Sequence, residues 1–318
     1  MSDAIVIENL CKRFGKNVAV NDVSLRVAEG GLYGFIGPNG AGKSTTIRMI
    51  MSIIFPDSGR LSVLGRASAV ESKDQIGYLP EERGVYRKMK VGAFLAHMAT
   101  LKGVDAGGAL TRKIKDWLER VGLGPQYGKK CEELSKGMQQ KVQFVACVLH
   151  EPELLILDEP FSGLDPVNAR LMRDLFLAEH ARGCTIIFST HHLASAEELC
   201  DHIIMIHQGV KVLDTTMEQI HSAHDPRRIV FRPADESQAM RIQSTPGVLG
   251  VERVNNFWEA ELDEGVDALQ ALATIASTTP CTRIELKRPT LEDIFVEMVI
   301  SGDFGQTAEE VRAALATP

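Results

Sequence analysis

The chain has 318 residues, with 35 basic and 42 acidic side chains and a net charge of −7. Its length predicts about two domains, and its 44% hydrophobic and 24% charged residues are ordinary for a globular protein. This composition excludes a disordered chain, a collagen and a disulfide scaffold, and the acidic balance argues against nucleic-acid or anionic-membrane binding through bulk charge.

The cysteines and the apolar runs indicate the compartment. Six cysteines without regular spacing predict reduced, structural thiols in a cytosolic protein. The N-terminus lacks the basic stretch and apolar core of a secretion signal. No run approaches the roughly 18 apolar residues of a membrane span. We therefore expect a cytoplasmic chain that does not cross a bilayer by itself.

Residues 1–222 predict an α/β domain. Residues 4–36 alternate apolar and polar side chains, which indicates strands, and a glycine-rich turn then leads into a helix. Residues 84–150 predict a helical subdomain, with helical spacing over 91–101, 110–121 and 135–149. From residue 154, continuous apolar strands alternate with helices, which is typical of a parallel sheet covered on both faces; these strands are 154–157, 185–189 and 202–207.

The alternation ends around residues 224–228, where we place a domain boundary. Residues 228–300 predict strand, helix, strand, strand, helix, strand and a final amphipathic helix capped at Thr290. The order βαββαβ is the ferredoxin-like α+β arrangement. Residues 301–318 are expected to form a surface-lying tail.

A glycine-rich motif lies between a predicted strand and a predicted helix. Residues 37–44 read Gly-Pro-Asn-Gly-Ala-Gly-Lys-Ser and fit the phosphate-loop (Walker A) pattern GxxxxGK[ST]. The glycines let backbone N–H groups turn toward phosphates, Lys43 reaches the β- and γ-phosphates, and the Ser44 hydroxyl ligates Mg²⁺. The expected nucleotide-binding residues are Gly37, Pro38, Asn39, Gly40, Ala41, Gly42, Lys43, Ser44 and Thr45.

Two carboxylates, Asp158 and Glu159, follow the buried strand 154–157. Ligands bind at this carboxyl end in open α/β sheets. Asp158 suits the Mg²⁺ shell, and Glu159 suits orienting or deprotonating an attacking water. Such a pair alone is more often a helix cap, but the upstream phosphate loop favours the catalytic interpretation.

The stretch between these motifs resembles one family. Residues 134–141 read Leu-Ser-Lys-Gly-Met-Gln-Gln-Lys and resemble the signature motif of ABC ATPases. At that helix N-terminus the Ser135 hydroxyl and the Gly137 N–H can donate to a terminal phosphate. By the same resemblance, Asp165 ends the D-loop, His191 is the switch histidine that contacts the γ-phosphate, and Phe14 stacks on adenine.

The resemblance covers roughly residues 3–222. Residues 288–295 narrow it to ATPases of the ABC-2 exporter type with an added domain, similar to sodium-efflux and drug-efflux ATPases. It implies a peripheral ATPase subunit that powers export through a separate membrane permease. The implied dimer is head to tail and holds two ATP molecules, each between the phosphate loop of one copy and Ser135 and Gly137 of the other. Glu159 would be the base, and the helical subdomain would carry motion to the permease.

Glu81 departs from the family pattern. Most members have glutamine at this position, which links Mg²⁺ and the attacking water to the membrane partner. A carboxylate can still ligate Mg²⁺, so we assign Glu81 to the nucleotide site and the metal shell. Its added negative charge beside the γ-phosphate is expected to affect coupling rather than nucleotide binding.

Two other interpretations remain. A soluble ABC ATPase of translation or DNA repair would usually carry two cassettes or a long coiled coil, and this chain has one cassette and no heptad run. A regulatory module that holds ATP without turnover is disfavoured because Glu159 and His191 are both present. The accessory domain could serve dimer contact or regulation, and its fold does not choose between them.

Overall fold

The computed structural model describes residues 2–82, 84–223, 227–263, 265–302 and 304–316. The chain divides into two compact units, of which the first combines Met1–Thr216 with Phe295–Pro318 and the second is Met217–Ile294. The boundary expected from the sequence includes residues 224–226, which lie outside the described residues. By contacts the division falls earlier, at Thr216, so that α7 (Met217–Ala223) belongs to the second unit.

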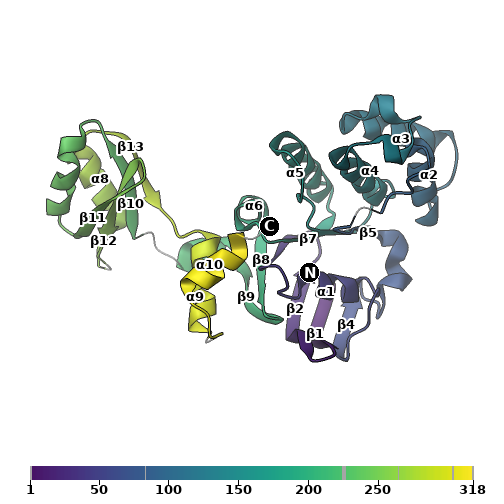
Figure 1. The fold of residues 1–318 in the computed structure, drawn as a ribbon, viewed down its shortest axis with the longest axis horizontal. Coiled ribbons are helices and arrows are strands. Elements are labelled where there is room, and N and C mark those ends of the chain that lie inside the picture. The colour runs from purple at the N-terminus through teal and green to yellow at the C-terminus, as the bar shows by residue number, and fades with distance from the viewer. Residues whose placement is uncertain (1, 83, 224–226, 264, 303, 317–318) are drawn as a thin grey trace. The chain divides into compact units, whose positions relative to one another are not determined.

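A six-stranded sheet forms the core of the first unit (Figure 1). Every neighbouring pair is parallel except β8–β9, so the predicted parallel sheet is confirmed with one antiparallel edge strand. Every residue of β3, β6 and β7 is buried, which explains why these strands are mainly apolar rather than alternating. The order is β5 (Ile76–Leu79), β6 (Leu154–Asp158), β7 (Thr185–Thr190), β3 (Leu32–Ile36), β8 (His202–His207) and β9 (Val210–Thr216).

A second, antiparallel sheet of three strands packs with this core. Its order is β2 (Asn17–Ala28), β1 (Asp3–Phe14) and β4 (Ser58–Val63). The helix α1 (Lys43–Ile50) directs Ile47 and Ile50 into one hydrophobic cluster with residues of both sheets. This packing fixes the helix whose N-terminus follows the glycine-rich motif.

The predicted helices are present within a few residues of their expected bounds. Figure 1 shows one helical group, which consists of α2 (Val91–Leu101), α3 (Gly108–Arg120) and α4 (Lys136–Val148). Trp117 of α3 and Phe144 of α4 meet edge to face. Two further helices, α5 (Pro166–Ala181) and α6 (Leu193–Leu199), follow β6 and β7, and Asp165 caps α5 through the N–H groups of Val167 and Asn168.

Short 3₁₀ segments complete the connections of the first unit. They are η1 (Ala69–Gln75), η2 (Gly124–Gln126) and η3 (Cys131–Glu133). All six cysteines are free thiols, of which four are buried and two, Cys11 and Cys281, are half-buried. In the described part of the chain, no helix combines the length and hydropathy that a membrane span requires.

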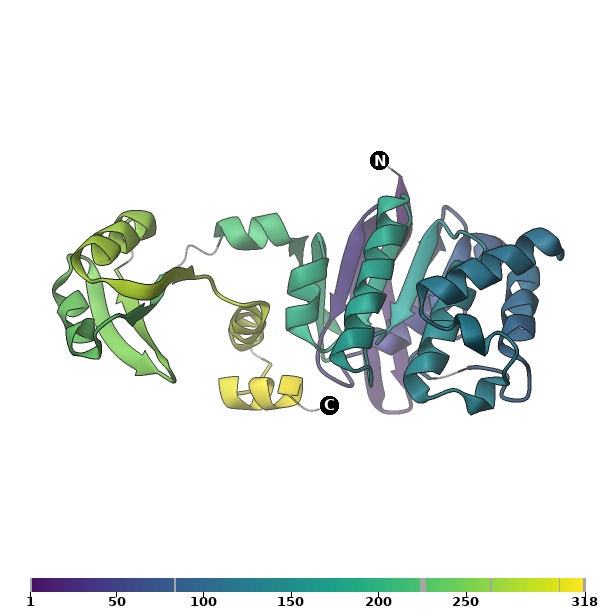
Figure 2. The same ribbon diagram turned by 90° about the horizontal axis from the view of Figure 1, so that it is seen from above.

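The second unit is a four-stranded antiparallel sheet with helices on one face (Figure 2). Its strand order, β11-β12-β10-β13, is that of the predicted ferredoxin-like arrangement, although the first helix is a 3₁₀ segment. Ile229, Phe231, Ile242 and Ile275 are among the residues of its core. The elements are β10 (Arg228–Pro233), η4 (Glu236–Ser244), β11 (Val248–Val254), β12 (Phe257–Leu262), α8 (Ala268–Thr278) and β13 (Cys281–Lys287).

The C-terminal segment differs from the surface-lying tail that the sequence predicts. After α9 (Leu291–Ser301) the chain forms another helix, α10 (Ala308–Ala316), which belongs to the first unit. Val311 and Leu315 of α10 are buried. They lie four residues apart and so share one helix face, which is the pattern of a docked helix.

Candidate nucleotide-binding site

A cavity of about 300 Å³ gathers most of the predicted nucleotide-binding residues. It lies over the phosphate loop and reaches from the β1–β2 hairpin to the end of β6. Two lining residues, Asn17 and Ala19, were not expected from the sequence. The lining comprises Phe14, Asn17, Ala19, Asn39, Gly40, Ala41, Gly42, Lys43, Ser44, Thr45, Glu81 and Glu159.

The phosphate loop requires glycine where the backbone is most crowded. Gly42 has a φ of +108°, and a Cβ there would lie 2.4 Å from the carbonyl oxygen of Ala19. A Cβ on Gly37 would lie 2.1 Å from the carbonyl oxygen of Ile206. Gly42 is also the N-cap residue of α1, and it has no side chain that could accept hydrogen bonds from the first N–H groups of the helix. The first N–H groups of α1 therefore remain available to an anion beside the cavity.

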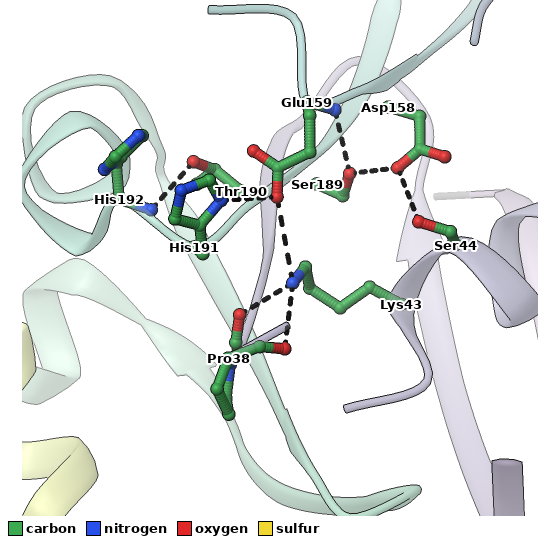
Figure 3. A network of polar contacts seen from close by, with 10 residues as sticks. Pro38, Lys43, Ser44, Asp158, Glu159, Ser189, Thr190, His191 and His192 are labelled. Carbon is green, nitrogen blue, oxygen red and sulfur yellow. Dashed lines mark hydrogen bonds and ion pairs between the residues drawn. The ribbon is translucent and has the colours of Figure 1, made fainter. Parts of the chain in front are cut away.

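Lys43 is buried among carbonyl and carboxylate oxygens (Figure 3). Its Nζ donates to the carbonyl oxygens of Gly37 at 2.7 Å and Pro38 at 3.2 Å, and it lies 3.7 Å from Oε1 of Glu159. Burial lowers the pKa of Lys43, and the charges of Glu159, Asp158 and Glu81 oppose that shift. The lysine therefore lies within electrostatic reach of all three predicted carboxylates.

Asp158 connects the phosphate loop to β7. Its Oδ1 accepts hydrogen bonds from Ser44 Oγ at 3.1 Å and from Ser189 Oγ at 2.5 Å (Figure 3). A hydroxyl beside one carboxylate, with space for phosphates and water, fits Mg²⁺, which usually takes one or two carboxylates plus substrate oxygens. Ser44 and Asp158 are the residues that would hold the ion, and Glu81 lines the same cavity as Ser44.

Glu159 and His191 form a buried pair. His191 Nδ1 lies 2.9 Å from Glu159 Oε1, and each side chain is about 8% exposed. Glu159 has a φ of +48°, a left-handed conformation that is uncommon for residues other than glycine. His191 Nε2 is buried and has no hydrogen-bond partner within the described residues. Of this pair, Glu159 lines the cavity, and His191 lies behind it in contact with its carboxylate.

Phe14 lines the cavity from the β1–β2 hairpin. It ends β1 next to the Gly15–Lys16 turn, pairs with Asn17 across the hairpin, and is 51% exposed. Lys12 Nζ lies 5.5 Å from its ring centroid. An exposed aromatic face at the edge of a phosphate site is suited to stacking on a base.

Glu81 lies two residues beyond the end of β5. Its side chain is exposed and lines the cavity. β5 pairs with β6, whose last residue is Asp158. The sheet therefore brings Glu81 and the two β6 carboxylates to the same edge, as parallel strands do at their carboxyl ends.

The signature-motif residues are not among those that line this cavity. Ser135 caps α4, accepting from the Met138 N–H at 3.4 Å, and its side chain is exposed. A Cβ on Gly137 would lie 3.6 Å from Leu164 and 3.9 Å from Asn168, so the signature motif adjoins the predicted D-loop. Hydrogen bonds from Asn168 lower the pKa of Asp165, which is exposed and anionic in that loop.

Two side chains near the site were not assigned from the sequence. Ser189 Oγ donates to Asp158 and accepts from the Glu159 N–H at 3.0 Å, so it orients the Asp158 carboxylate and holds the backbone of Glu159. Gln140 Nε2 donates to the Pro160 carbonyl oxygen at 2.6 Å, which ties α4 to the segment after β6. The signal for Ser189 is its position in the strand directly before Thr190 and His191.

Both units of the chain match families found among ATP-binding proteins of transporters. Residues 20–162 match the family described as ABC transporter, and residues 216–299 match the family described as ATP-binding protein DrrA1-3-like, C-terminal domain. Residues 130–196 also match an AAA domain described as putative AbiEii toxin, Type IV TA system.

Two relatives match over nearly the whole chain. The chain is 37% identical over 295 residues to the uncharacterized ABC transporter ATP-binding protein YhaQ of Bacillus subtilis (strain 168), covering 93% of this chain and 98% of that protein. It is 31% identical over 330 residues to the bacitracin transport ATP-binding protein BcrA of Bacillus licheniformis, covering 96% and 100%. A solved ATP-binding subunit of an ABC transporter has a TM-score of 0.64 at 31% identity, covering 69% of this chain and 92% of that one.

These relatives favour a transporter ATPase over a soluble ATPase of translation or DNA repair. Their near-complete coverage agrees with the two-unit fold, and most of the phosphate loop lines one cavity together with Glu159. The chain belongs to the ATP-binding proteins of ABC transporters, the ATPase family that powers these transporters.

Proposed function

We propose that this chain powers export as a head-to-tail homodimer, with ATP and Mg²⁺ between the two copies and a separate permease in the cell membrane. The observation that carries this proposal is the separation of two sets of residues. Lys43, Ser44 and Glu159 line one cavity, whereas Ser135 and Gly137 lie outside its lining. A second copy turned head to tail supplies the missing donors to each nucleotide.

The chain's own residues have distinct roles in this proposal. The N–H groups of the phosphate loop and Lys43 bind the β- and γ-phosphates, and the Phe14 ring stacks on adenine. Glu159 accepts a proton from the attacking water at its carboxylate, while His191 Nε2 contacts the γ-phosphate. When bound, Mg²⁺ supplies positive charge that neutralises the phosphate oxygens. Catalysis is then mainly positional and electrostatic.

The export direction and the membrane location also belong to this proposal. Residues 288–295 and the DrrA-like match support an exporter, and the name of BcrA refers to bacitracin transport. The cargo is selected by the permease, and the chain lies at the inner face of the membrane. The helical group α2–α4 and the segment at Glu81 carry the coupling to that partner.

The oligomeric state tests the proposal most directly. We expect the Glu159→Gln variant to be a monomer without nucleotide and a dimer with ATP and Mg²⁺ in light scattering after gel filtration. Adding Ser135→Arg, which places a bulky cation where the second nucleotide must approach, should keep it monomeric. Ser58→Arg, an equal change at an exposed serine of β4, should leave the dimer intact.

The native complex provides a second test. Solubilised membranes should yield the chain together with a polytopic protein. A chain that stays monomeric with ATP, both alone and in its native complex, contradicts the dimer proposal. Recovery only with ribosomes or DNA would favour the soluble alternative instead.

A further inference from the structure

The turn that follows β8 contacts the phosphate loop. A tight turn at Gln208 and Gly209, both with positive φ, joins β8 to β9. The Gly209 N–H donates to the carbonyl oxygen of Ala41 at 2.8 Å, and the Gly209 carbonyl oxygen accepts from the Asn21 N–H at 2.8 Å. The position of this turn therefore affects the conformation of the phosphate loop.

His207, the residue before this turn, is held by the C-terminal segment. Its side chain is 3% exposed, and Nε2 lies 2.6 Å from Oε1 of Gln306. Phe295 and Phe304 meet the imidazole edge to face, with centroid distances of 5.6 and 5.1 Å. A residue beside the phosphate loop is thus enclosed by residues about 100 positions later in the chain.

The hydrogen bonding of this cluster is directional. Gln208 Nε2 also donates to Oε1 of Gln306, at 3.4 Å, so this oxygen is the acceptor and His207 Nε2 carries the proton. Burial lowers the pKa of His207, which favours the neutral ring. Gln306 is therefore the partner that satisfies the buried N–H of His207.

We propose that three described residues of the C-terminal segment, Phe295, Phe304 and Gln306, form a clamp that positions the phosphate loop, acting through His207 and the β8–β9 turn. The chain enters this segment directly from the second unit, which ends at Ile294. The accessory unit is thereby covalently connected to an element that supports ATP binding. This inference rests on the phosphate loop being the ATP site, and Gln306 is a positioning residue that touches no nucleotide.

The test is ATP affinity in the full-length chain, measured by titration with a fluorescent ATP analogue and Mg²⁺. Gln306→Leu removes the acceptor at nearly constant volume and leaves the His207 N–H buried and unpaired. We expect ATP to bind about fivefold more weakly, because fewer molecules hold the loop in its binding conformation. The kcat at saturating ATP should stay near that of the wild type, because bound ATP restores that conformation.

A double variant separates the clamp from general stability. In His207→Phe with Gln306→Leu, an apolar pair replaces the polar pair, and the affinity should return to within twofold of the wild type. Gln75→Leu makes the same change at a half-buried glutamine that bonds to Glu153 away from the phosphate loop, and should leave the affinity unchanged. Amide exchange at Gly209 should accelerate in Gln306→Leu alone.

The outcomes are distinguishable. If Gln306→Leu lowers the melting temperature but binds ATP as tightly as the wild type, the clamp is only structural and the inference is overturned. A double variant as weak as the single variant also overturns it. Failure of the wild-type chain to bind ATP would instead contradict the proposed function.

Discussion

Oε1 of Glu159 is shared between His191 and Lys43, at 2.9 Å from His191 Nδ1 and 3.7 Å from Lys43 Nζ. One buried carboxylate oxygen therefore faces both the lysine of the glycine-rich loop and the histidine that follows β7. Electrostatic interactions are stronger in such a site than in water. The position of Glu159 suits a carboxylate that accepts the proton of the attacking water while negative charge develops on the phosphate.

Glu159→Gln should separate binding from turnover. The amide keeps the shape of the side chain but loses most of its basicity, so we expect hydrolysis to fall by about 10²–10⁴, the range for loss of a general base. ATP binding should survive, because Lys43 and the loop N–H groups remain. Phosphate release and nucleotide titration measure the two effects.

The matched control is Glu153→Gln, the same change at a glutamate that bonds to Gln75 outside the cavity. It should hydrolyse ATP at the wild-type rate. If Glu159→Gln retained near-normal turnover, Glu159 would not be the base.

Glu81→Gln should affect coupling more than chemistry. The side chain is exposed at the cavity rim, and its charge acts on Lys43 together with those of Asp158 and Glu159. Removing one of these charges should leave basal hydrolysis within about threefold, because Glu159 and the phosphate loop are unchanged. The ratio of permease-stimulated to basal hydrolysis should change. Identical ratios in wild type and variant would show that Glu81 takes no part in coupling.

The sequence predicted the elements of this fold well because each has a strong local signal. The unbroken apolar strand 154–157 is buried throughout, and Asp165 caps α5 as its type and position suggest. The glycine-rich motif predicted the loop for the same reason, since a side chain at Gly42 would collide with Ala19. Most of the predicted nucleotide-binding residues consequently line one cavity.

Long-range contacts were less accessible from the sequence. The hydrogen bond between Gln306 and His207 joins positions 99 residues apart, and no local sequence pattern at either residue predicts it. The bond from Ser189 to Asp158 is similar, because it depends on β6 and β7 being neighbours in register. A surface-lying tail was expected after residue 300, yet α10 forms there and buries Val311 and Leu315 on one of its faces.

Ser189→Ala should weaken the metal site without removing a ligand. Ser189 Oγ donates to Asp158 and accepts from the Glu159 N–H, so its loss leaves the Asp158 carboxylate and the backbone of Glu159 less well held. Outer-shell partners of metal ligands typically contribute about 10–100-fold to affinity or activity. We expect kcat to fall by about tenfold and the Mg²⁺ concentration for half-maximal activity to rise.

Ser189→Thr keeps the hydroxyl and should recover most of the loss, although its methyl group must fit a fully buried position. Titration of activity against Mg²⁺ at saturating ATP measures the effect. An unchanged Mg²⁺ requirement in Ser189→Ala would contradict this role.

His150 should make the first unit less stable in mild acid. Burial lowers the pKa of His150 from 6.5 to about 4, and its Nδ1 is buried without a hydrogen-bond partner among the described residues. Between these values the unfolded chain binds a proton that the folded chain does not. The free energy of unfolding therefore decreases as the pH falls from about 6.5 to about 4, by about 1–3 kcal/mol in total, since one pKa unit corresponds to about 1.36 kcal/mol.

Urea unfolding at pH 7, 5.5 and 4.5 measures this effect, with Trp117 as the probe in a Trp258→Phe background so that the second unit does not contribute. His150→Gln cannot titrate and should lose about 1–3 kcal/mol less stability than the wild type across this range. His97→Gln, at an exposed histidine, should follow the wild type. Parallel losses in the wild type and His150→Gln would mean that the folded and unfolded chains protonate His150 alike, and that other groups cause the acid sensitivity.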